Sequence, residues 1–140
     1  MKIFDTTLTR LEESLDVRLV EHNVLAGNVA NADTPGYKSR ELDFSQAMAA
    51  AEQQSAGSGM AATDPRHLST SDGDGSRATA AATMLVRSGG GSSPSIDGNE
   101  VDLDRTMAGL AENGLQYGAS ARAAGKKLAI LRYVVSDGAS

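Results

Sequence analysis

The chain has 140 residues, of which 15 are glycine and only 4% are aromatic, and it contains no cysteine. This length allows one domain at most, and the scarcity of aromatic residues argues against a large packed core. The absence of cysteine excludes disulfide bonds, thiolate metal sites and cysteine nucleophiles. A formal net charge of −5 argues against nucleic acid binding, which requires a basic surface.

Neither membrane insertion nor general secretion is expected from this sequence. No apolar run approaches the roughly 18 residues that a membrane-spanning helix needs. The N-terminus carries Lys2 but neither a continuous apolar stretch nor a small-residue cleavage site, so it does not resemble a secretory signal peptide.

A long amphipathic helix is predicted from about Phe4 to Asn31. One of its faces repeats at alternating spacings of four and three residues, which is typical of a coiled-coil-like seam. The seam positions are Phe4, Leu8, Leu11, Leu15, Arg18, His22, Leu25 and Val29. Val17, Val20 and Val24 form a second apolar line beside the seam, so we expect this helix to face more than one neighbour.

The helix ends in a specific turn at residues 27–37, Gly-Asn-Val-Ala-Asn-Ala-Asp-Thr-Pro-Gly-Tyr. Proline disfavours helical backbone in the preceding residue, so Thr34 is predicted to be extended. Pro35 and Gly36 suit the two central positions of a type II turn, because proline fixes φ and glycine accepts a positive φ. Taken alone, these residues also fit an ordinary helix end followed by a turn.

A short helix and a glycine-rich segment follow the turn. The run Asp43-Phe44-Ser45-Gln46 matches a capping box that opens a helix to about Gln54. Residues 53–98 are rich in glycine and serine, and such a composition buries too little apolar surface to offset the entropy of ordering. We therefore predict a flexible middle region with small apolar anchors of one turn or a short strand each. These anchors are Leu68 and the run Met84-Leu85-Val86.

The last part of the chain, residues 99–140, is predicted to form a second long helix. Ten successive positions keep the four-and-three rhythm without a charged residue, which indicates a coiled-coil-like helix. These positions are Leu103, Met107, Leu110, Gly114, Tyr117, Ala121, Ala124, Leu128, Leu131 and Val135. Asn99, with Asp102 three residues further on, is the expected N-terminal cap.

Together these elements predict a fold dominated by α-helices. The long N- and C-terminal helices form a coiled-coil-like hairpin, so residues 1–52 and 99–140 make one discontinuous domain around the flexible middle region. A two-helix hairpin buries little surface and is marginally stable by itself. Assembly with neighbouring subunits would cover the apolar positions that the hairpin leaves open.

The turn segment resembles the signature of the bacterial flagellar axial proteins, which are the rod, hook and hook-associated subunits. The matching turn-motif residues are Asn28, Val29, Ala30, Asn31, Thr34, Gly36 and Tyr37, with Pro35 inside the motif. Gly27 departs from the pattern, which usually has a polar or small helix-compatible residue there. Residues 63–68 and 97–104 also resemble the basal-body rod proteins, and most of all the proximal rod subunits. Thr106 is a small departure, since the family more often has glutamate at that position.

This resemblance implies a structural subunit of the flagellar basal-body rod. Such a subunit is transiently cytoplasmic, is exported by the flagellar type III apparatus, and polymerises through its terminal helices in the rod that spans the periplasm. The rod transmits torque from the membrane ring to the hook. The implied partners are the export apparatus, further copies of the chain, other rod subunits and the rod-to-membrane-ring adaptor. The expected assembly seam comprises Leu8, Leu11, Leu15, Leu25, Leu103, Met107, Leu110, Tyr117, Leu128 and Leu131.

Phe44 and Met48 resemble the short aromatic-x-x-x-apolar element by which early substrates engage the export gate. The same spacing occurs at Phe4 and Leu8. Any amphipathic helix offers this pattern, so ordinary core packing is the alternative interpretation.

Two other classes of function compete with this interpretation. An enzyme would have to use His22, His67 and the carboxylates, but no recognised metal-ligand spacing or nucleophile motif is present. We therefore expect no catalytic, cofactor or metal site. A soluble coiled-coil adaptor or secretion chaperone would also have long helices at both ends, but it does not need the turn motif. A chaperone would be a folded dimer by itself, whereas an axial subunit would be weakly helical until it polymerises.

Overall fold

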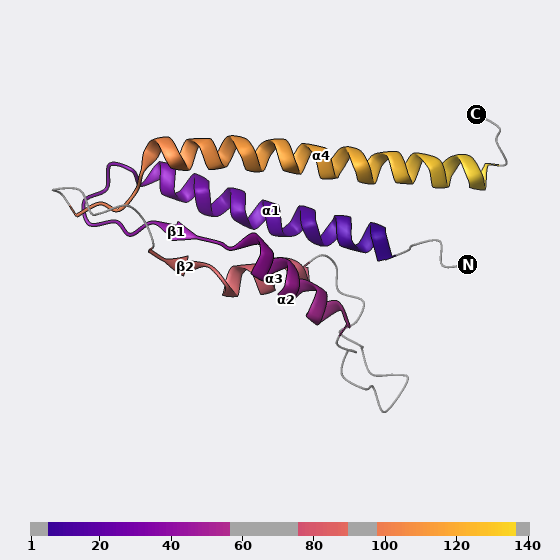
Figure 1. Ribbon diagram of the computed structural model, residues 1–140, viewed down its shortest axis with the longest axis horizontal. Helices are drawn as coiled ribbons and strands as arrows, with labels where there is room; N and C mark the ends of the chain where they lie inside the picture. Colours follow the sequence, from indigo (N-terminus) through magenta and orange to yellow (C-terminus); the bar gives the residue numbers. More distant parts are fainter. Residues whose placement is uncertain (1–5, 57–75, 90–97, 137–140) are drawn as a thin grey trace, which may run out of the picture.

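The computed structural model describes residues 6–56, 76–89 and 98–136 of the chain. Within these ranges the chain forms four helices and two short strands. In chain order they are α1 (Thr6–Ala30), β1 (Arg40–Glu41), α2 (Phe44–Ala56), α3 (Ser76–Met84), β2 (Arg87–Ser88) and α4 (Leu103–Val135). Figure 1 shows α1 and α4 side by side and antiparallel, with the remaining elements on the opposite side of α1. The predicted hairpin of long terminal helices is therefore confirmed.

A small apolar core lies between α1 and the α2–α3 pair. Val17 is fully buried and Val20 nearly so, and both pack with Ala47 of α2 and Ala82 of α3. Half-buried side chains close this cluster, namely Val24, Leu42, Phe44, Met48, Leu85 and Val86. The second neighbour that the valine line of α1 was expected to meet is thus the α2–α3 pair. Among the described residues, no side chain larger than that of Val17 is fully buried, so the core is small.

Residues 76–89 form regular structure, whereas the sequence predicted a flexible region over residues 53–98. This stretch contains α3 and β2. Alanine is the strongest helix former, and its small side chain lets α3 approach its neighbours closely. Ala78, Ala81 and Ala82 are accordingly buried. A composition averaged over the whole middle region hides this alanine-rich stretch, which explains why the prediction differs from the structure.

The two strands tie this middle stretch to the end of α1. They pair antiparallel, with Arg40 opposite Ser88 and Glu41 opposite Arg87. The Gly89 N–H also donates a hydrogen bond of 2.7 Å to a backbone carbonyl just before β1. Backbone hydrogen bonds therefore join the segment that follows α1 to the segment that follows α3.

Aspartates cap two of the helices. The Asp43 carboxylate accepts hydrogen bonds from two backbone N–H groups in the first turn of α2, at 2.9 and 3.1 Å, which confirms Asp43 as the cap. The reciprocal half of the predicted capping box is not formed, because the Gln46 amide oxygen accepts from Arg87 instead. The cap of α4 is Asp102, whose side chain accepts a hydrogen bond of 3.0 Å from the Arg105 N–H. The prediction that Asn99 caps this helix is wrong, because the Asn99 amide binds a different segment of the chain.

Candidate assembly surface

The turn after α1 has the predicted geometry. The Tyr37 N–H donates a hydrogen bond of 3.2 Å to the Thr34 carbonyl, so Pro35 and Gly36 occupy the two central positions. The φ of Gly36 is 71°, the positive value that a type II turn requires of its third residue. A Cβ built on Gly36 would meet nothing within 4 Å, so backbone conformation rather than crowding favours glycine there.

The first asparagine of the turn motif, Asn28, binds the start of β1. Only 3% of this residue is exposed, although it lies in the last turns of a helix. Its amide nitrogen donates to the Arg40 carbonyl at 2.7 Å, and its amide oxygen accepts from the Arg40 N–H at 2.9 Å. The Tyr37 hydroxyl donates to the same oxygen at 3.4 Å. Asn28 therefore holds β1 and the turn against the end of α1.

The second asparagine of the motif, Asn31, joins the last turn of α1 to the type II turn. Its amide nitrogen donates to the Gly27 carbonyl at 2.8 Å, which satisfies a carbonyl at the helix end. Its amide oxygen accepts from the Thr34 hydroxyl at 3.4 Å, and its carbonyl accepts from the Thr34 N–H at 3.0 Å. Both asparagines thus have structural roles that need an amide, which has a donor and an acceptor in one group.

The segment before α4 docks on the same turn. Asn99 is 5% exposed, and its amide nitrogen donates to the Ala32 carbonyl. The Glu100 N–H donates to the Tyr37 carbonyl at 3.1 Å. A Cβ built on Gly98 would lie 3.7 Å from the Cα of Gly36. The turn motif at residues 27–37 and the motif at residues 97–104 are therefore in contact and form one structural unit. The sequence analysis treated them as separate and did not predict this contact.

A polar cluster at the middle of the hairpin joins three helices. The Arg18 guanidinium donates to the Asn113 amide oxygen at 3.2 Å, and the Asn113 amide nitrogen donates to the Arg18 carbonyl at 2.9 Å. Arg18 also forms an ion pair of 3.3 Å with Glu21 and lies 4.0 Å from the centre of the Phe44 ring in α2. Asn113 is buried on α4. This pairing between polar groups fixes the register of α1 against α4, as buried asparagines do in coiled coils.

Burial raises the pKa of the Glu21 carboxyl in this cluster. The Arg18 guanidinium opposes that effect, while the nearby Glu112 carboxylate raises the pKa further. Negative charge is therefore disfavoured where the middle of α4 approaches α1.

The α4 residues expected on the assembly seam divide into two groups. Leu110, Ala124 and Leu131 are half buried, as are the α1 seam residues Leu8, Leu11, Leu15 and Leu25. A second group keeps about half of its surface open to solvent and consists of Leu103 at 47%, Met107 at 50%, Tyr117 at 42% and Leu128 at 48% exposed. Thr106 and Asn113 are buried on α4 instead of Met107 and Gly114. One apolar line of α4 is thus left uncovered by the chain itself.

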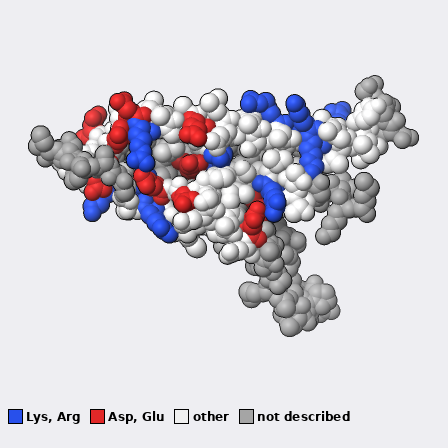
Figure 2. Space-filling model, viewed as in Figure 1, with Lys and Arg blue, Asp and Glu red and all other residues white. Residues whose placement is uncertain are grey.

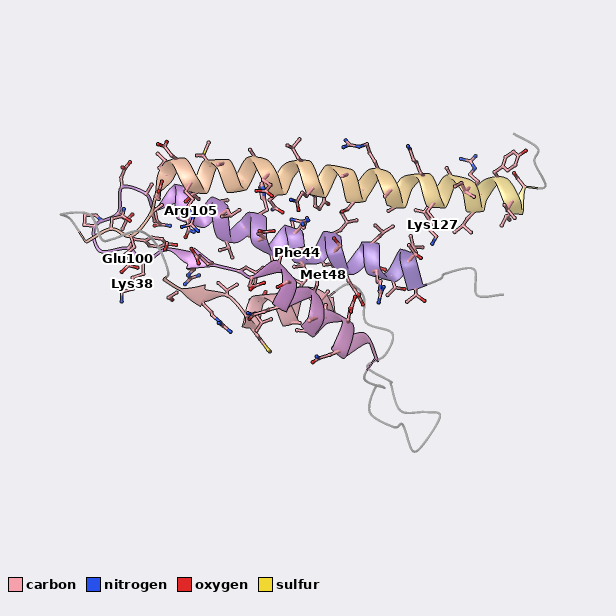
Figure 3. All side chains as sticks on the ribbon, viewed as in Figure 1. Lys38, Phe44, Met48, Glu100, Arg105 and Lys127 are labelled. Carbon is pink, nitrogen blue, oxygen red and sulfur yellow. The ribbon has the colours of Figure 1, made fainter. Side chains whose placement is uncertain are left out.

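The two residues predicted to engage the export gate, Phe44 and Met48, do not lie on the exposed line of α4. Figure 3 shows Phe44 and Met48 on α2, and both are half buried against the core. In the folded chain they therefore pack as ordinary core residues. His22 is exposed, while Phe4, His67 and Leu68 lie outside the described residues.

Within the ranges that the structure describes, no group of three or more His, Asp or Glu side chains is arranged to hold a metal ion. The described helices also include none that is long and apolar enough to cross a membrane. What the described structure offers instead is an apolar line on a long helix, next to a rigidly built turn. These features are those of a helical structural subunit.

Comparison with known proteins shows which structural subunits it resembles. The family described as flagella basal body rod protein matches residues 18–38, which cover the end of α1 and the turn. The flagellar basal body rod protein FlgB of Salmonella typhimurium is 31% identical over 138 residues, covering 96% of each chain. FlgB of Bacillus subtilis is 31% identical with 99% of each chain covered, and that of Yersinia enterocolitica is 34% identical over 117 residues, or 81% of each. The chain therefore belongs to the FlgB family of flagellar basal-body rod proteins.

Proposed function

We infer that this rod protein is a proximal rod subunit that polymerises through α1 and α4. The apolar line of α4 is the observation that carries this proposal. Nine of the eleven exposed large apolar side chains among the described residues lie on α4. Four of the nine form the line of Leu103, Met107, Tyr117 and Leu128. The other exposed apolar residues of this helix lie mostly on its other faces and are Leu115, Ile130, Tyr133, Val134 and Val135. An apolar surface of this extent on one helix is typical of a protein–protein interface.

The two helices have different parts in this assembly. α1 is covered on one side by α4 and on another by the α2–α3 pair, so it has little apolar surface to offer. α4 is covered by α1 alone among the described elements. Neighbouring subunits would therefore pack mainly on α4, and the turn at residues 34–37 would fix where each chain leaves the packed helices.

The small core also suits export of an unfolded chain by the flagellar type III apparatus. A core in which Val17 is the largest fully buried side chain adds little to the free energy of unfolding. Phe44 and Met48 would become accessible to the export gate in the unfolded chain. After export, packing between subunits supplies the stability that the monomer lacks and lets the rod transmit torque from the membrane ring to the hook. The functional surface in this proposal is a set of shared helix contacts, without catalysis.

A deletion strain tests the proposal. We expect loss of motility and of the rod and hook, and we expect the protein in hook–basal bodies purified from the parent strain. Complementation with the intact gene should restore motility and the assembly of the rod and hook. A motile deletion strain with normal basal bodies would overturn the proposal.

A further inference from the structure

The second half of α4 is a basic surface. From Asn113 to Ser136 the chain contains four basic residues and no acidic residue, and the basic residues are Arg122, Lys126, Lys127 and Arg132. Figure 2 shows Lys and Arg with no Asp or Glu between them along this part of the molecule. Ile130 and Tyr133 are exposed among these basic residues, at 63% and 59%. This half of α4 therefore presents positive charge together with apolar side chains.

A groove at the opposite end of the molecule has the complementary charge. It lies between the end of α1, β1 and the first half of α4, and its volume is about 460 Å³. Seven charged residues line it, which are Glu21, Glu41, Glu100, Asp102 and Glu112 with Arg40 and Arg105. Five carboxylates and two guanidinium groups line the groove, and Arg18 beside it pairs with Glu21, so a net negative charge remains. Burial raises the pKa of Glu21, the Arg18 guanidinium opposes that effect, and the Glu112 carboxylate across the groove raises the pKa further.

The groove also contains a buried polar atom that the described residues leave unsatisfied. Ser39 lines the groove and is only 6% exposed, and its hydroxyl oxygen has no hydrogen-bond partner in the described part of the chain. Leaving a buried polar atom unpaired costs free energy. The oxygen has almost no exposed surface as it stands, so a guanidinium or ammonium group bound in the groove would pair with it after a rotation of the Ser39 side chain.

We propose that this groove binds the basic second half of α4 from a second copy of the chain, so that copies associate head to tail. The groove's own α4 cannot supply the occupant, because the groove residues Glu100 and Arg105 and the basic Lys127 lie towards opposite ends of the hairpin (Figure 3). A helix of 33 residues is about 50 Å long and rigid. The contact therefore has to be between molecules.

This arrangement agrees with growth along an axis. A head-to-tail interface uses two different surfaces, so each added copy leaves one of each kind open and assembly continues as long as the copies do not close into a ring. The proposal rests on the proposed function, since it specifies one of the contacts through which the rod subunit polymerises.

Charge reversal tests the contact in the full-length chain. Glu112→Lys places a cation at the groove, and Lys126→Glu places an anion on the basic half; both residues are exposed. Glu112→Lys removes the repulsion with Glu21 but also the hydrogen bond of 2.8 Å from Gln116, so circular dichroism of each variant has to show a folded chain before a loss of association counts. Glu12→Lys, at an exposed position of α1 outside the groove, is the control with the same change of charge.

Sedimentation equilibrium at low and high salt measures the association. We expect the mass of the wild-type chain and of Glu12→Lys to grow beyond a dimer with concentration at low salt, and less at high salt. Each reversed variant alone should associate roughly tenfold more weakly, and an equimolar mixture of the two should associate as the wild type does.

Two results would overturn the proposal. In the first, Glu112→Lys and Lys126→Glu each associate as strongly as the wild type. In the second, the wild-type chain stays monomeric at every concentration and salt level. Either result leaves the rod function intact if the deletion strain still lacks rod and hook. A motile deletion strain, by contrast, would count against the rod function itself.

Discussion

Asn28 binds both backbone hydrogen-bonding groups of Arg40, twelve residues further along the chain. The two distances are 2.7 and 2.9 Å, so the side-chain amide takes the place of a second neighbouring strand beside β1, in addition to its partner β2. Because Asn28 is anchored in α1, this pair fixes where the chain returns to the helix after the turn. The rest of the turn, and the docking of Asn99 on it, depend on that position.

Replacing Asn28 by alanine should destabilise the folded chain. The Arg40 N–H and carbonyl would lose their partners in a partly buried place, which costs about 1–3 kcal/mol in the free energy of unfolding. Urea denaturation followed by circular dichroism measures this change. Asn23→Ala is the matched control, because Asn23 is an exposed asparagine on the same helix. Equal stability of the two variants would contradict the role given to Asn28.

Replacing Gly36 by valine should prevent assembly while leaving synthesis intact. The φ of 71° is disfavoured for a β-branched residue and costs roughly 1–2 kcal/mol, although a Cβ there meets no atom within 4 Å. The check is the presence of the variant in purified hook–basal bodies, together with motility. Gly36→Asn should retain more assembly, because asparagine tolerates a positive φ better than valine does. Normal motility of the valine variant would show that the conformation of this turn is not needed for assembly.

Local rules were enough to predict α1, α2 and α4, the Asp43 cap and the turn. Each depends on a few neighbouring residues, such as the proline–glycine pair at the turn and the acceptor that precedes α2. The long helices follow from a four-and-three rhythm that tertiary packing did not override. The same rules missed α3, because its alanines are few within a long glycine-rich stretch.

The arrangement of polar side chains could not be predicted from periodicity. The rhythm places Met107 and Gly114 on the α4 seam, but Thr106 and Asn113 are buried there instead. Asn113 takes this place because it pairs with Arg18, and a pairing across 95 residues has no local signal. Periodicity detects an apolar line on a helix, but it does not show whether the same chain or a neighbour covers that line.

Replacing Leu128 by aspartate should block incorporation into the rod with little effect on the monomer. Leu128 is 48% exposed, so the loss in the free energy of unfolding should not exceed about 1 kcal/mol. A buried carboxylate in a subunit interface would be far more costly. Quantification of the variant in purified basal bodies, beside urea denaturation of the isolated chain, separates the two effects.

Two further variants complete this experiment. Ala129→Asp changes a neighbouring exposed residue of α4 and should be incorporated better than Leu128→Asp. Leu131→Asp should fail in both measurements, because Leu131 is half buried in the monomer. Normal incorporation of Leu128→Asp would exclude the exposed line of α4 as the assembly surface.

The cap of α2 should make the stability of that helix depend on pH. The hydroxyl of Ser45 and two backbone N–H groups donate to the Asp43 carboxylate, and these hydrogen bonds lower its pKa in the folded chain. A carboxyl whose pKa is lower when folded contributes stability above its unfolded pKa of about 3.9. That contribution is lost as the pH falls through the lower, folded pKa. Stability of the wild type should therefore decline more steeply below about pH 4 than that of Asp43→Asn, which cannot titrate.

Thermal unfolding monitored by circular dichroism between pH 2 and 7 measures this difference between the two chains. Asp33→Asn is the control, since Asp33 is an exposed aspartate outside any helix or strand of the described chain. Its pH profile should follow the wild type. If Asp43→Asn kept the same decline below about pH 4 as the wild type, the hydrogen bonds at the start of α2 would not stabilise the ionised carboxylate, and other carboxylates would have to explain the acid sensitivity.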